Sequence, residues 1–170
     1  MFGRWLRGET ETLPQSGGDA LRESVARHLP GVDAETITVV TSMAGLLGAV
    51  AYADRDYSLA EEARVRQELG RVQGMTASGI DAICLALREH IVEISTVQIP
   101  RYARALVELG DVELRREVLS ALLDLAAADD SISLVETNML RQITKSLGLS
   151  QDDYLELQAK HRRQLDSLKG

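Results

Sequence analysis

The sequence VAYADRDYSLAEE at residues 50–62 is repeated in altered form, 75 residues later, as LAAADDSISLVET at residues 125–137. Six of the thirteen aligned positions are identical. These positions are Ala51/Ala126, Ala53/Ala128, Asp54/Asp129, Ser58/Ser133, Leu59/Leu134 and Glu61/Glu136. After a one-residue deletion the match extends to the sequences GMT at residues 74–76 and GLS at residues 148–150. A repeat of this length predicts a duplicated structural unit, in which each half reads as helix, acidic turn, helix, glycine turn and helix.

Both repeats carry the signals that begin and end helices. Ser58 with Glu61, and Ser133 with Glu136, have the spacing of a capping box. In such a box the serine accepts a hydrogen bond from the amide three residues on, and the glutamate accepts one from the serine amide. The glycine turns at residues 74 and 148 suit the left-handed conformation that follows many helices. The repeat therefore predicts two three-helix units, at residues 33–95 and at residues 111–168.

The rest of the chain also has helical periodicity, and no stretch alternates with the period of a β-strand. Aliphatic residues and alanine must fill the core because only 4% of the residues are aromatic. We therefore predict an all-α fold, a compact bundle of about seven or eight helices. The expected helices span residues 19–27, 33–54, 58–72, 76–93, 100–110, 111–128, 133–147 and 150–168.

Residues 36–53 contain no charged side chain, so this stretch could be either a membrane span or a buried helix of a soluble protein. About 18 apolar residues can span a membrane. Several threonine, serine and glycine residues lower the hydropathy of this stretch, however, and Ala44 and Gly48 are small enough to allow a close helix crossing. A buried central helix is the favoured interpretation, and a membrane span is the alternative.

Length and charge exclude several classes of function. A chain of 170 residues suits one domain, expected here at residues 19–170 after a flexible tail at residues 1–18. The formal net charge of −7 argues against a nucleic-acid partner. The single cysteine, Cys84, cannot form an internal disulfide, so we expect a cytoplasmic location. In the tail, Phe2, Trp5 and Leu6 beside two arginines are candidates for a peripheral membrane or partner contact.

Acidic residues in the two turns are the candidate functional site. Asp54 and Asp129 fall at predicted helix C-termini, where a negative charge costs about 0.3–1 kcal/mol. A divalent cation such as Ca²⁺, Mg²⁺ or Mn²⁺ prefers oxygen ligands and would reverse that repulsion. The spacing is not that of an EF-hand, and the alternative is that each aspartate only accepts amide hydrogen bonds within its turn. The candidate metal ligands are Asp54, Asp56, Glu61, Asp129, Asp130 and Glu136.

The paired motif, Ala-Asp-x-x-x-Ser-Leu-x-Glu with a Gly-Leu-Ser turn, resembles the TerB-like tellurite-resistance family, which is related to the N-terminal domain of the DjlA co-chaperones. The resemblance covers residues 33–163. It implies two pseudo-twofold related helical repeats, an acidic divalent-metal site and a role in stress-response or membrane-associated protein complexes, without known catalysis. Family turns often have glycine after the aspartate, whereas this chain has Arg55 and Asp130.

Chemistry beyond the acidic turns has little support in the sequence. His28, His90 and His161 lack metal-ligand spacing, and neither a zinc-protease motif nor a phosphate-binding glycine loop is present. We therefore expect a non-enzymatic, cation-binding module with protein partners and no organic cofactor. A metal-free adaptor or co-chaperone-like interaction domain is the first alternative. A metal-assisted hydrolase is the second.

Overall fold

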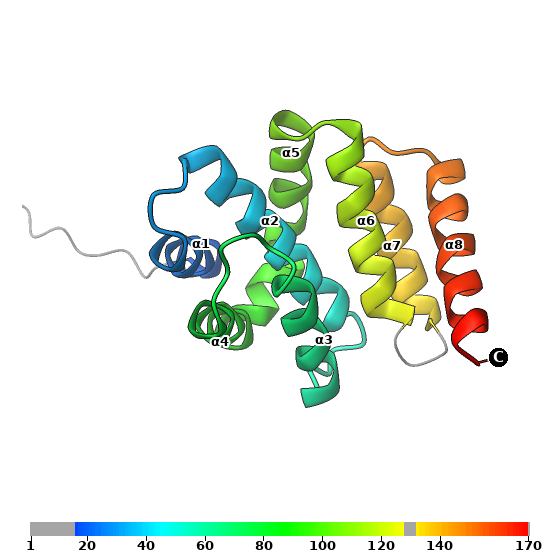
Figure 1. Ribbon diagram of the computed structural model, residues 1–170, viewed down its shortest axis with the longest axis horizontal. Coiled ribbons are helices and arrows are strands. Elements are labelled where there is room, and N and C mark those ends of the chain that lie inside the picture. The colour runs from blue at the N-terminus through cyan, green and yellow to red at the C-terminus, as the bar shows by residue number, and fades with distance from the viewer. Residues whose placement is uncertain (1–15, 128–131, 170) are drawn as a thin grey trace, which may run out of the picture.

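The computed structural model describes residues 16–127 and 132–169, and these ranges contain helices and short connections without a β-strand (Figure 1). This confirms the predicted all-α fold. The elements are α1 (Gly17–His28), α2 (Ala34–Ala51), α3 (Leu59–Leu69), α4 (Ala77–Glu93), the π-helical segment η2 (Ile94–Gln98), α5 (Ile99–Leu109), α6 (Val112–Ala126), α7 (Leu134–Ser146) and α8 (Gln151–Lys169).

Side-chain caps begin most of the helices, and all of these caps except Ser16 stand where the sequence predicts a helix start. The residues whose side chains accept the amide three positions on are Ser16, Asp33, Ser58, Thr76, Asp111, Ser133 and Ser150. Gly74 and Gly148 have φ values of +85° and +68°, as the glycine turns require. Local sequence thus sets the helix boundaries, while the equivalence of the two halves in space stays a prediction.

The uncharged helix α2 is the centre of the bundle. It contacts α1, α3, α4, α5, α6 and α7. By length and composition it is a helix that could cross a membrane, but 67% of it is buried inside the protein, as expected for a core helix. Gly48 lies against Leu87 of α4, and Gly45 lies against the ring of Tyr102 of α5. A methyl group added at Gly45 would stand 2.1 Å from that ring, so the close crossing needs glycine.

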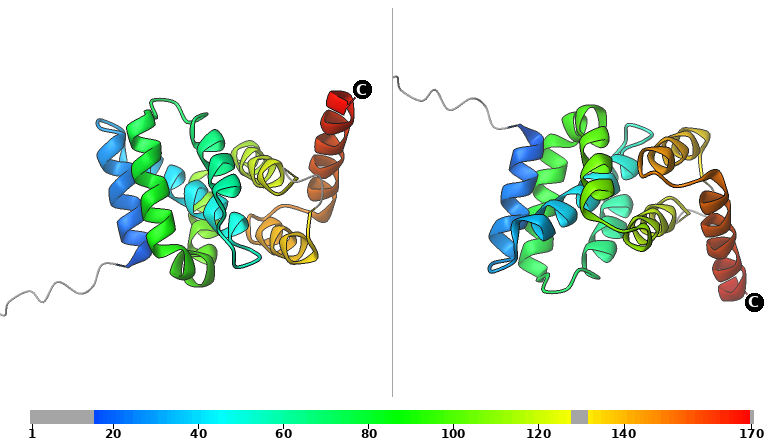
Figure 2. Two further views of the ribbon diagram at one scale, coloured as in Figure 1. Left: turned by 90° about the horizontal axis from the view of Figure 1, so that it is seen from below. Right: turned by 90° about the horizontal axis from the view of Figure 1, so that it is seen from above.

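The other helices lie on two sides of α2 (Figure 2). Helices α1 and α4 run side by side at one end, while α6, α7 and α8 form the opposite end. Helix α8 packs on α6 and α7. This arrangement places the turn between α2 and α3 and the first residues of α7 along the same lower edge in Figure 1.

Several predicted boundaries differ from the structure, and α2 and α3 end at Ala51 and Leu69 where residues 54 and 72 were expected. Helix α1 begins at Gly17, whereas the sequence suggested a joint at Gly17-Gly18 and a helix from Asp19. Gly17 is buried against α4, where its amide donates to the Glu93 carboxylate at 2.7 Å. A side chain at Gly17 would meet His90, with Cβ atoms 2.7 Å apart. Tight packing therefore explains this glycine.

The predicted helices at residues 76–93 and 100–110 are joined without a loop. The π-helical segment η2 links α4 to α5, and His90 just before it has a non-helical backbone (φ −121°, ψ 18°). Pro100 stands in the first turn of α5, where the missing amide hydrogen does no harm. Only tertiary packing identifies such a π segment, which is why periodicity missed it.

Candidate functional site

The first acidic turn connects α2 to α3. Asp54, Arg55 and Asp56 are all exposed. Arg55 has a left-handed backbone (φ +67°), and its amide donates to the Tyr52 carbonyl at 2.8 Å. The Asp56 amide donates to Oδ1 of Asp54 at 3.0 Å. Asp54 therefore makes the amide-accepting turn that the sequence offered as the alternative to a metal ligand, and Arg55 occupies the conformation that glycine adopts most easily.

Glu61 closes the same turn from the start of α3. Its Oε2 accepts the Ser58 amide at 2.9 Å, and the Glu61 amide donates to Ser58 Oγ at 3.2 Å, which completes the predicted capping box. Burial raises the pKa of the Glu61 carboxyl, the hydrogen bonds from Ser58 oppose that rise, and the negative charges of Asp54 and Asp56 add to it. The three carboxylates thus lie near enough to repel one another.

The described residues do not form a ready metal centre. No group of three or more histidine, cysteine, aspartate or glutamate side chains within residues 16–127 and 132–169 has the geometry to hold an ion. One oxygen of Asp54 and one of Glu61 are already used by backbone amides. Asp129 and Asp130 lie outside the described residues. In the second turn the Glu136 amide donates to Ser133 Oγ at 3.2 Å, as predicted.

The edge that carries the acidic turn also exposes apolar side chains. Leu59 and Leu134, which occupy equivalent positions in the sequence repeat, are the first residues of α3 and α7. Their exposed fractions are 78% and 75%, the highest among the large hydrophobic residues described, and Val135 beside Leu134 is also exposed. Leucine at the start of a helix is not needed for capping, so capping does not explain the exposed leucine in both repeats.

A buried polar array joins α6 to α8. Nδ1 of His161 lies 2.6 Å from Oδ1 of Asp124, and Nε2 of the same ring lies 3.1 Å from Ser120 Oγ. His161 is 7% exposed. On the other side of Asp124, Arg71 reaches it at 3.7 Å and also pairs with the buried Glu68 at 3.3 Å. Burial raises the pKa of the Glu68 carboxyl, while Arg71 opposes the rise.

Sequence reasoning missed this array. Ser120 and Asp124 are four residues apart on α6, a spacing that puts them on one helix face. Their histidine, however, comes from a helix more than thirty residues further along the chain. The order Ser–His–Asp is that of a hydrolase triad. Ser120 lies inside α6, though, where the helix uses the backbone amides that an oxyanion hole would need. The array therefore acts as a connection between helices.

Cys84 also lacks the properties of a nucleophile. It is fully buried in α4, and this burial raises the pKa of its thiol to about 11. A thiol of that pKa carries almost no thiolate near neutral pH. Cys84 is therefore a small residue of the core.

Comparison with known proteins identifies the family. The model of the family described as tellurite resistance protein TerB matches residues 40–159, which is more than half of the chain. No curated protein and no solved structure matches. The matched range runs from α2 into α8 and includes both acidic turns, the two capping serines and the two glycine turns. This chain belongs to the TerB family of tellurite-resistance proteins.

Proposed function

We propose that this chain is a non-enzymatic TerB-type module that binds another protein in a stress-response complex. The observation that carries the proposal is the pair of exposed leucines, Leu59 and Leu134, at the starts of α3 and α7. Both helices begin at the same edge of the bundle (Figure 1). Asp54 and Asp56 lie next to this edge in the chain and are exposed. A partner with an apolar patch flanked by basic side chains would complement this surface.

The stress-response role in this proposal rests on the family alone. The geometry of the described acidic residues fits an adaptor that binds no metal.

A second proposal is that the acidic turn between α2 and α3 binds a divalent cation. Because Asp54 and Asp56 both oppose ionisation of Glu61, a divalent cation would relieve repulsion in this turn. Ligands from the second turn or from the partner would have to complete its shell. We propose a cytoplasmic location and no organic cofactor for this module.

Two substitutions test the protein-binding proposal. Leu59→Ser and Leu134→Ser remove exposed apolar surface at the edge, while Leu85→Ser removes an exposed leucine of α4 as the control. Partners are captured with the full chain from stressed cells and identified by mass spectrometry. We expect both edge variants to lose a partner that the wild type and Leu85→Ser retain, with unfolding curves unchanged. Capture that is the same for all four proteins would refute the proposed edge.

Amide NMR titrations with Ca²⁺, Mg²⁺ and Mn²⁺ test the cation. We expect saturable shifts at Asp54, Asp56 and Glu61 with Ca²⁺ or Mg²⁺ and line broadening with paramagnetic Mn²⁺, and both effects should disappear in Asp56→Asn. The carboxylate oxygens of Asp56 take no part in the described bonds of the turn, so this substitution leaves the turn intact. An absence of shifts in either acidic turn at millimolar metal would leave the metal-free adaptor as the function of this edge.

A further inference from the structure

A polar pocket lies on the opposite part of the bundle from α7 and α8, between α1, α2, η2 and α5. Its volume is about 190 Å³. This is room for roughly six water molecules, and it is smaller than the ~300–1,000 Å³ of a drug-sized site. The lining residues are Gly18, Asp19, Arg22, Thr38, Thr41, Ser42, Gln98, Arg101, Tyr102 and Ala105. Most of these side chains are polar, which is unusual for a gap between core helices.

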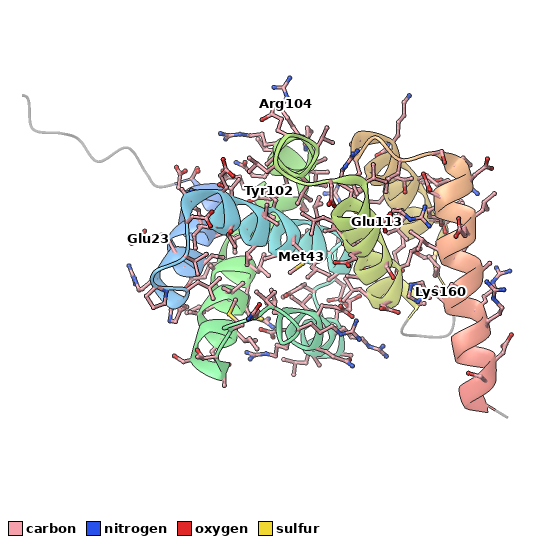
Figure 3. The ribbon with its side chains drawn as sticks, turned by 45° about the horizontal axis from the view of Figure 1, so that its top comes forward. Glu23, Met43, Tyr102, Arg104, Glu113 and Lys160 are labelled. Carbon is pink, nitrogen blue, oxygen red and sulfur yellow. The ribbon has the colours of Figure 1, made fainter. Side chains whose placement is uncertain are left out.

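Tyr102 lines this pocket, and its hydroxyl is an unused hydrogen-bond donor whose oxygen is closed off from solvent. The side chain reaches from α5 toward α2 (Figure 3) and is 6% exposed, with its ring packed on Gly45. Its hydroxyl has no hydrogen-bond partner among the described residues. Burial raises the pKa of this phenol to about 12, so the hydroxyl keeps its proton near neutral pH. It can therefore donate a hydrogen bond to an acceptor. A buried hydroxyl without a partner destabilises the folded protein, so a ligand that accepts its hydrogen bond would be favoured.

Two arginines in the same lining have no acidic partner. Within the described ranges, neither Arg22 nor Arg101 has a carboxylate oxygen within 4.0 Å, although six other arginines form ion pairs. Arg22 donates to Thr38 Oγ1 at 2.5 Å and to the Ala34 carbonyl at 3.3 Å, which fixes its position. Arg101 makes one long bond, at 3.5 Å, to Gln98. Its remaining donors are available to a ligand.

The lining of the pocket carries more positive than negative charge, although the nearby Glu93 carboxylate offsets the difference. Asp19 is the one acidic residue in the lining, against two arginines. Glu93 lies close enough to affect Tyr102, but its carboxylate is held by the Gly17 amide and by Gln98. A carboxylate or phosphate group would accept hydrogen bonds from the exposed guanidinium of Arg101, and from the Tyr102 hydroxyl once a shift of the lining side chains uncovers it.

We propose that this pocket binds a small oxyanion, a carboxylate or phosphate group, through Arg101, Tyr102 and the positioned guanidinium of Arg22. The pocket is on a different surface from the proposed protein-binding edge, so neither proposal depends on the other. No covalent step is involved. The exposed Arg101 and Asp19 mark the side from which the anion enters.

The test is an amide NMR titration of the full chain with inorganic phosphate and, separately, with acetate, at constant ionic strength set with chloride. We expect saturable shifts at Gly18, Ser42 and Tyr102 with phosphate, with acetate or with both. The anion that saturates identifies the class of ligand. Chloride alone should leave these signals unchanged. Shifts that do not saturate at millimolar phosphate or acetate would overturn the proposal.

Variants of α5 give the matched comparison. Arg101→Gln and Tyr102→Phe should each weaken binding about tenfold, the size expected from losing one charge-assisted bond. Tyr102→Phe keeps the ring that packs on Gly45, and equal melting temperatures would show that its fold is intact. Arg104→Gln is the control, because Arg104 points away from the bundle in Figure 3 and pairs with Glu108 at 3.9 Å. An Arg104 variant that loses as much affinity as Arg101→Gln would refute the assignment.

Discussion

Replacing Arg55 with glycine should stabilise the protein, because Arg55 holds a backbone conformation that suits glycine. Its φ of +67° is the only positive value at a non-glycine residue that the described chain contains. Two hydrogen bonds keep the backbone of this turn in place. The Arg55 amide donates to the Tyr52 carbonyl at 2.8 Å, and the Asp56 amide donates to Oδ1 of Asp54 at 3.0 Å. The arginine side chain itself is exposed and can be removed without opening the core.

The size of the effect follows from two opposing free energies. A left-handed residue with a Cβ atom costs about 1–2 kcal/mol. Glycine is more flexible in the unfolded chain, and this flexibility lowers the free energy of unfolding by about 0.5–1 kcal/mol. The net gain for Arg55→Gly is therefore about 0.5–1 kcal/mol in the free energy of unfolding. For a chain of this length each kcal/mol raises the melting temperature by about 2–4 °C.

Urea unfolding followed by far-UV circular dichroism measures this difference, with Arg55→Ala as the matched control. Both variants remove the positive charge beside Asp54 and Asp56, but alanine keeps the Cβ atom and its strain. We expect Arg55→Gly to be more stable than Arg55→Ala. Equal stability of the two variants, or a less stable glycine variant, would show that the turn does not hold Arg55 in the left-handed region.

Three further predictions concern packing, capping and pH. Gly45→Ala should lower the free energy of unfolding by about 1–3 kcal/mol, because its new methyl group overlaps the Tyr102 ring, and calorimetry would measure the loss. Ser58→Ala should cost about 1 kcal/mol by removing the α3 cap, and restored stability in Ser58→Asp would confirm the cause. Hydrogen bonds from Ser150, aided by Arg116, hold the pKa of Asp153 below 3.8 in the folded state. The Asp153 carboxylate therefore stabilises the protein fully above pH 3.8, and this stabilisation is lost as the pH falls below 3.8 through the lower pKa of the folded state. In an acid titration, the free energy of unfolding of Asp153→Asn should fall less steeply than that of the wild type.

Much of the fold could be predicted because its signals are local. Ser58, Ser133 and the left-handed Gly74 and Gly148 each act on the adjacent turn of the helix, so their roles follow from neighbouring residues. The buried helix α2 was predictable in the same way, from its uncharged composition. The start of α1 was placed too late because Gly17 owes its role to Glu93, 76 residues away.

The polar sites needed tertiary structure. His161 meets Asp124 and Ser120 only when α8 packs on α6. Tyr102 faces a pocket only because η2 joins α4 directly to α5 and sets the direction of α5. The sequence offered amide acceptance by Asp54 as one of two alternatives, and only the structure shows that one of its oxygens accepts the Asp56 amide.

The central position of α2 has a consequence for the newly made protein. On the ribosome, residues 34–51 are synthesised before α4, α5 and α6, which later cover them. At about 5–20 residues per second, the last of these helices follows after several seconds. Throughout that interval a helix of membrane-spanning length and composition has most of its intended neighbours missing. In the nascent chain this segment therefore presents the length and composition that chaperones and targeting factors recognise in apolar helices, whereas the finished bundle buries it.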